Sequence, residues 1–151
     1  VESIYEVDGQ PQLLYRFTVS GEAYQGRMRL AEPPTRLRNG WPLAPGDQFR
    51  VRYVSDNPKL SELQLQLPAK EQVAQYRERA LQRHLALHPE ATEAQARCLL
   101  ELAYEEKGVP GLADFYHQET PQAENPQANA LTYRRLIRSL DFRKRAEQQC
   151  W

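Results

Sequence analysis

Hydrophobic and polar residues alternate along residues 1–68, which is the pattern of half-buried β-strands. The alternation is clearest over residues 13–19, where apolar side chains fall on every second position, and over residues 49–54. Between two such segments, Asp8-Gly9 predicts a two-residue hairpin turn. We therefore predict an antiparallel β module of about five strands over residues 1–68.

The second predicted hairpin has two registers that fit the pattern. A two-residue loop at residues 20–21 places Phe17 opposite Tyr24, whereas a loop at residues 21–22 places Val19 opposite Tyr24. Both keep the apolar side chains of the two strands on one face. The sequence therefore leaves both registers open.

The prolines of residues 31–45 predict a long loop without regular structure. Trp41 lies in this loop and has two interpretations. An exposed Trp41 would be a contact residue for a partner, and the alternative is a ring that folds back onto the β core. A second break is predicted at Asn57-Pro58, with the last strand following it up to Pro68.

From Ala69 onward the apolar period changes from two residues to about 3.6, the period of an α-helix. The first predicted helix runs from Ala69 to about residue 88. Thr92 with Gln95 three residues later resembles a capping box, so a second helix begins there and ends near Gly108.

A short helix is predicted to continue to about His117, and a final helix runs from about residue 128 to about residue 147. The inward-facing residues of this final helix are predicted to be Tyr133, Leu136, Ile137 and Leu140. The fold class is therefore α+β. The β module of residues 1–68 is followed by a bundle of three or four helices over residues 69–151, which we expect to pack against it.

Composition narrows the functional classes. The chain has 151 residues, 40% of them apolar, and a formal net charge of zero, which argues against a general nucleic-acid binder. Residues 134–145 are nevertheless rich in Arg and Lys, whereas residues 70–124 carry an excess of Asp and Glu. We interpret this as a basic last helix beside acidic earlier ones. The alternative is a juxtamembrane or phosphate-facing role.

The two cysteines, Cys98 and Cys150, leave two possibilities open. They form a disulfide if the chain lies in an oxidising compartment, or they are two independent thiols. The sequence has no apolar run long enough to span a bilayer and no signal peptide. It begins with Val1 in a predicted strand, so we expect that an upstream segment was removed.

The candidate chemistry is sparse. His84 and His88 are four residues apart, the spacing at which two imidazoles on a helix can share a metal ion. The residues between them include no glutamate, so the motif of a helical zinc hydrolase is incomplete and two structural histidines are the simpler interpretation. Arg50 and Arg52 form the polar face of a strand, either as charges that protect an edge or as a partner-binding patch. No active site and no cofactor are predicted.

Three motifs within about residues 4–65 resemble a bacterial family called domain of unknown function 3592. They are Tyr15-Arg16-Phe17-Thr18-Val19 with Gly21, Tyr24 and Gly26, then Gly46-Asp47-Gln48-Phe49-Arg50-Val51-Arg52-Tyr53, then Asn57-Pro58 with Ser61-Glu62-Leu63. The sequence departs from the family pattern at Ser55, where a proline is usual, and at Phe49, where a β-branched residue is usual. The resemblance implies a small β module next to transmembrane helices in envelope proteins, without known enzymatic activity. The helical half is outside it.

We predict a non-catalytic, extracytoplasmic domain of a membrane-tethered bacterial envelope protein, on the periplasmic face of the inner membrane, that works by binding another protein. An immunity or adaptor protein is one specific form of this prediction. Its partner-contact candidates are Trp41, Arg50 and Arg52; no nucleic acid is expected, and the membrane would be reached through a segment absent from this chain. The alternatives are a metal-dependent hydrolase using His84 and His88 with a nearby carboxylate, and a purely structural extramembrane domain.

Overall fold

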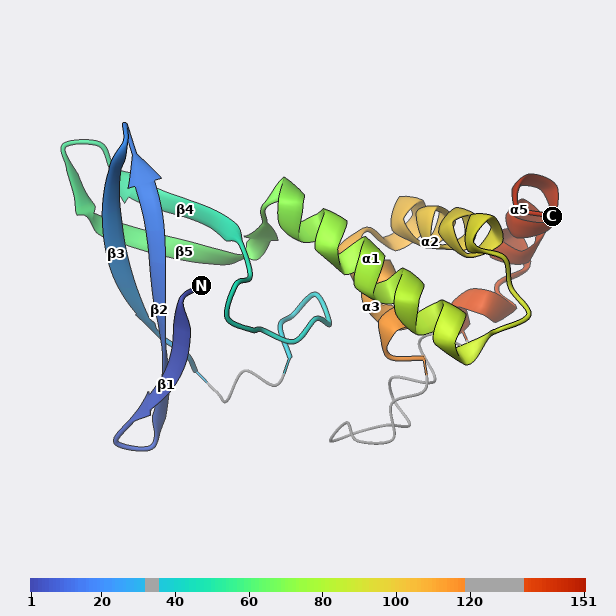
Figure 1. Ribbon diagram of the computed structural model, residues 1–151, viewed down its shortest axis with the longest axis horizontal. Helices are drawn as coiled ribbons and strands as arrows, with labels where there is room; N and C mark the ends of the chain where they lie inside the picture. Colours follow the sequence, from blue (N-terminus) through green and yellow to red (C-terminus); the bar gives the residue numbers. More distant parts are fainter. Residues whose placement is uncertain (32–35, 119–134) are drawn as a thin grey trace. The chain divides into compact units, whose positions relative to one another are not determined.

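The computed structural model describes residues 1–31, 36–118 and 135–151. The chain divides into two compact units, Val1–Val73 and Ala74–Trp151. Five strands come first and helices follow, which confirms the predicted α+β class (Figure 1).

A three-stranded antiparallel sheet opens the first unit, with β1 (Ser3–Val7), β2 (Gln10–Val19) and β3 (Glu22–Arg29) in that order. Two-residue loops join them, at residues 8–9 and 20–21, and all four loop residues have positive φ. That conformation gives a type I′ turn, whose twist matches that of the strands. Of the two registers open to the sequence, the structure has the one that pairs Phe17 with Tyr24.

The second sheet is a hairpin of β4 (Phe49–Val54) and β5 (Asn57–Pro68). The chain turns at residues 55–56, so the predicted break at Asn57-Pro58 is wrong and both residues belong to β5. Pro58 lacks a backbone N–H, and a strand tolerates this where one of its edges has no neighbour to bond. In a two-stranded sheet, each strand has such an edge.

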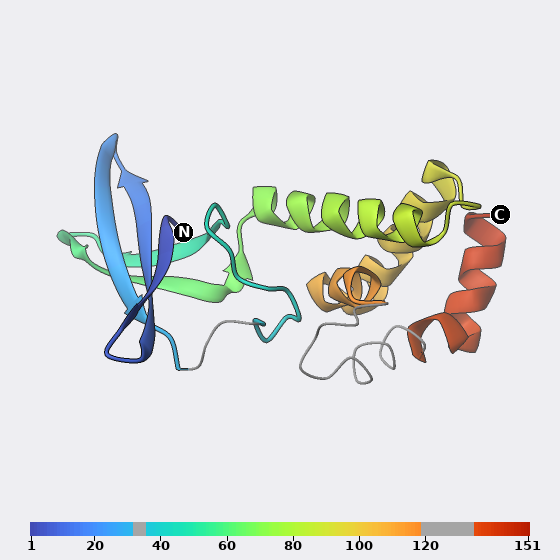
Figure 2. The same ribbon diagram turned by 60° about the horizontal axis from the view of Figure 1, so that its bottom comes forward.

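The core of this unit lies between the two sheets, whose strands run across each other in Figure 2. Its buried residues are Leu13, Tyr15, Leu30, Leu43, Phe49 and Leu63. Tyr15 comes from the first sheet, and its hydroxyl lies 2.9 Å from Ser61 Oγ of the second. Gly26 makes room for this ring, because a Cβ at that position would overlap it. Gly26 therefore leaves the space that the Tyr15 ring occupies.

A buried polar cluster joins the loop before β4 to the start of α1 (Lys70–Leu87). Asp47 and Gln72 are both fully buried. Asp47 Oδ1 accepts from Gln72 Nε2 at 3.1 Å, and its Oδ2 accepts from the Ala44 amide at 2.8 Å. The Gln48 amide donates to Gln72 Oε1 at 2.8 Å. Each polar group therefore has a partner, as burial requires.

The second unit contains the remainder of α1, then α2 (Glu93–Lys107), α3 (Val109–Tyr116) and α5 (Leu140–Gln149). The predicted capping box of α2 is confirmed, since Thr92 Oγ1 accepts from the Gln95 amide and the Gln95 side chain accepts from the Thr92 amide, both at 3.2 Å. None of the helices within the described ranges has the length and apolar character needed to cross a membrane.

The predicted final helix is interrupted in the structure. Residues 135–138 are helical, Ser139 has an extended ψ of 125°, and α5 starts at Leu140. Because of this break, the buried positions become Leu136, Phe142 and Ala146, while Leu140 is 64% exposed, so the prediction that Leu140 faces inward is wrong. The start of the predicted helix, including Tyr133, lies outside the described residues.

Candidate functional site

The outer face of the β4–β5 hairpin carries two of the three predicted contact residues. Val51 packs against the core, and side chains alternate along a strand, so Arg50 and Arg52 point away from it. Both are exposed. The structure therefore confirms that they share the polar face of a strand.

Arg52 is paired across the hairpin. It lies opposite Glu62 in the register, and its Nη2 is 2.8 Å from Glu62 Oε2. Both side chains stay more than half exposed, at 73% and 57%, so solvent screens the pair and its contribution to stability is small. The pair places the Arg52 guanidinium group beside Glu62 on the outer face of the hairpin.

Leu60 completes this surface. It lies two residues before Glu62 on the same side of β5 and is 60% exposed. We call the surface formed by Arg50, Arg52, Leu60 and Glu62 the hairpin face. Sequence analysis missed Leu60 and Glu62, because the break predicted at Asn57-Pro58 gave no register in which Glu62 lies opposite Arg52.

Trp41, the third predicted contact, is fully buried. Its amide donates to Asn39 Oδ1 at 3.0 Å, and its carbonyl accepts from the Leu37 amide at 2.7 Å. The ring therefore offers no exposed surface to a partner. The structure buries this ring and leaves Arg50 and Arg52 as the exposed candidates.

His84 and His88 lie together, with ring centroids 4.5 Å apart, and both face Gln118. The Gln118 Nε2 is 3.4 Å from His84 Nδ1, and its Oε1 is 3.3 Å from His88 Nε2. An amide nitrogen only donates and an amide oxygen only accepts, so this arrangement needs a neutral His84 with its proton on Nε2. Burial, followed by the nearby His88, lowers the pKa of His84, which favours the same neutral form.

Glu90 brings a carboxylate to this pair, with its Oε1 3.3 Å from His88 Nδ1. Within the described residues, His, Cys, Asp and Glu side chains do not gather in groups of three or more that could hold a metal ion. His117 is the C-cap residue of α3. His84 and His88 thus form a polar network around Gln118, a residue that carried no signal in the sequence.

Cys98 and Cys150 form a disulfide, which settles the question that the sequence left open. Cys98 lies in α2 and Cys150 caps α5, and their Cα atoms are 5.5 Å apart. Arg145 of α5 also forms ion pairs with Glu105 and Glu106 of α2. A basic last helix therefore does lie beside an acidic one, as the charge pattern predicted.

Comparison with family models, with curated proteins and with solved structures found no match for this chain. The resemblance of residues 4–65 to domain of unknown function 3592 therefore stays a prediction.

Proposed function

We propose that this chain is a non-catalytic, extracytoplasmic domain of a membrane-tethered bacterial envelope protein, and that it binds another protein through the hairpin face. The observation that carries the proposal is that face itself. It presents two arginines and an exposed leucine on a strand pair whose other side is anchored in the core. Arginine is enriched at protein interfaces and among the residues that dominate their energy.

The disulfide supports the extracytoplasmic part of the proposal. Disulfides persist in oxidising compartments such as the bacterial periplasm, whereas cytosolic thiols are kept reduced. Cys98–Cys150 links two helices of one unit. The predicted resemblance of residues 4–65 to membrane-adjacent β modules points the same way. An immunity or adaptor protein that recognises one partner is the specific form we favour.

Site-specific photocrosslinking in bacterial cells that produce the full-length protein tests the hairpin face. A photoreactive residue replaces Arg52 or Leu60 in two variants, and in a control it replaces exposed Glu93 of α2. We expect one crosslinked product from both hairpin positions and none from the control. Charge reversal by Arg50→Glu should weaken that product. Equal labelling from all three positions, or no product, would overturn the proposal.

Thiol alkylation of protein taken directly from cells tests the compartment. If the chain is extracytoplasmic, Cys98 and Cys150 resist alkylation until a reductant is added. Two thiols that react at once in the non-reduced sample would place the chain in a reducing compartment and refute that part of the proposal.

The rival function is a metal-dependent hydrolase that uses His84, His88 and Glu90. The facing ring nitrogens contact Gln118, so a metal ion would have to displace its amide. Metal analysis of the purified protein separates the two functions. Stoichiometric zinc that disappears in His84→Ala would favour the hydrolase. A third possibility, a purely structural extramembrane domain, predicts no crosslinked product from the hairpin face.

A further inference from the structure

The outer face of the three-stranded sheet carries a second group of arginines. The core side of β2 contains Leu13 and Tyr15, so Arg16 faces outward. The register places Arg27 opposite Leu14 and Arg29 opposite Gln12, which puts both on the same outer face. All three arginines are exposed. We call the surface formed by Arg16, Arg27 and Arg29 the arginine face.

This face has few carboxylates to balance its charge. Arg16 pairs with Glu2 at 2.8 Å, and Gln25 Nε2 also donates to Glu2 at 3.0 Å. Within the described part of the chain, Arg27 and Arg29 have no ion pair of their own. The outward positions of β1, β2 and β3 contain no Asp or Glu. The arginine face is therefore a positive area on a chain whose net charge is zero.

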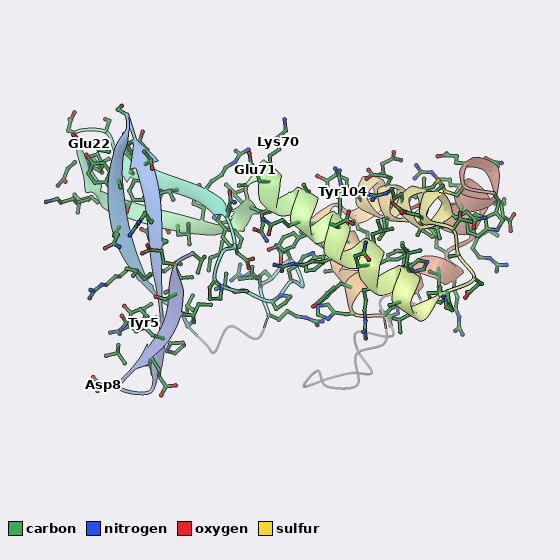
Figure 3. The ribbon with its side chains drawn as sticks, viewed as in Figure 1. Tyr5, Asp8, Glu22, Lys70, Glu71 and Tyr104 are labelled. Atoms are coloured by element: carbon green, nitrogen blue, oxygen red, sulfur yellow. A yellow bond between two sulfur atoms is a disulfide. The ribbon has the colours of Figure 1, made fainter. Side chains whose placement is uncertain are left out.

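The surroundings of the arginines resemble a protein-binding surface. Tyr5 lies on β1 opposite Gln12 and its hydroxyl donates to Gln12 Oε1 at 3.4 Å (Figure 3). Tyr and Arg are the residue types that most often dominate protein interfaces.

The spacing of the two unpaired arginines specifies the partner further. Arg27 and Arg29 are two residues apart on one strand, which separates them by about 6.6–6.8 Å. Carboxylates two residues apart in an extended peptide have the same separation and also lie on one side. Guanidinium groups bind carboxylates through paired hydrogen bonds, so the match is geometric as well as electrostatic.

We propose that the arginine face binds an acidic extended segment of a partner protein, with glutamates or aspartates at alternate positions facing Arg27 and Arg29. This inference rests on the proposed function, since it names the chemistry of a protein partner. It adds a second contact surface to the hairpin face, on the other sheet of the same unit.

The test uses a synthetic peptide with glutamate at every second position, followed by NMR of the full chain at low ionic strength. We expect the side-chain signals of Arg27 and Arg29 to move on titration. The double variant Arg27→Glu, Arg29→Glu should weaken binding about tenfold or more, because attraction becomes repulsion. Arg27→Lys, Arg29→Lys should keep part of the affinity. Arg50→Glu, the matched control on the other sheet, should stay within about twofold.

Two results would overturn the inference. One is an equal loss of binding in the Arg50→Glu control, which would show nonspecific attraction. The other is binding of phosphatidylglycerol vesicles that depends on Arg27 and Arg29 when the peptide does not bind, which would assign the face to a lipid surface. Crosslinking from the hairpin face does not depend on either result, so failure of this inference and failure of the proposed function are distinguishable.

Discussion

The disulfide between Cys98 and Cys150 should contribute about half of the stability of the helical unit. We consider a double variant, Cys98→Ser with Cys150→Ser, which removes the link and leaves two small polar side chains. The bond closes a loop with a sequence separation of 52 residues. The loop-closure entropy of a chain segment of this length corresponds to about 4 kcal/mol at 25 °C.

This magnitude is about as large as the contribution of the hydrophobic core expected for a unit of this size. Residues 74–151 form a unit of the class whose single core rarely supplies more than about 3–5 kcal/mol. The contacts of α5 that remain include the buried side chains of Phe142 and Ala146 and the solvent-accessible ion pairs of Arg145. Exposed ion pairs contribute about 0–1 kcal/mol each. We therefore expect the helical unit to lose about half of its stability in the double variant.

The two tryptophans allow each unit to be observed separately. Circular dichroism at the helical band reports the second unit, and the buried Trp41 reports the first by fluorescence in a Trp151→Phe background. In urea titrations, we expect the midpoint of the helical transition to fall to about half its native value in the double variant, while the Trp41 transition keeps its midpoint. Reducing the native chain should reproduce this result, and reducing the variant should change nothing. A helical transition whose midpoint does not move would refute the reasoning.

Two further changes test the core and the histidine network. Gly26→Val should destabilise the first unit by about 1–3 kcal/mol, because the valine side chain would overlap the Tyr15 ring. Urea unfolding followed through Trp41 should show this loss, with Ser20→Ala in the adjoining turn as the control for a mutation in the same hairpin. An unchanged midpoint for Gly26→Val would contradict the packing. The stability of the helical unit should fall as the pH drops from above 6.5 through the lowered pKa of His84, because the unfolded chain binds this proton more readily than the folded one. The same titration in His84→Leu should lose this component, and an equal pH dependence in both proteins would show that other groups are responsible.

Much of the β module is predictable because its signals are local. Both type I′ turns contain the residues that tolerate positive φ, and a two-residue loop fixes the pairing that follows it. The choice between the two registers of the second hairpin is not local. It places Gly26 opposite Tyr15, and the Tyr15 hydroxyl then reaches Ser61 on another sheet, 46 residues away. Only the assembled core distinguishes the two registers.

The helical half shows where an apolar period is an incomplete guide. The pattern around Leu136 and Ile137 continues through Leu140, so a single helix is the natural prediction. Ser139 instead takes an extended conformation, which ends one helical segment and rotates the next, and Phe142 replaces Leu140 on the buried side. The apolar period assumes an unbroken helix, so it gives no sign of a break in the backbone within that helix.

The candidate surfaces depend on register in the same way. Arg50 and Arg52 stand out in the sequence because they alternate with apolar residues, but the partner of Arg52 is known only once β4 pairs with β5. Arg27 and Arg29 alternate in the same way, but the sequence alone does not distinguish them as candidates. What distinguishes them is that no carboxylate faces them from the neighbouring strands. An unpaired charge is a property of the folded sheet. Such a surface is therefore defined by the side chains that lie across the strand from each exposed arginine.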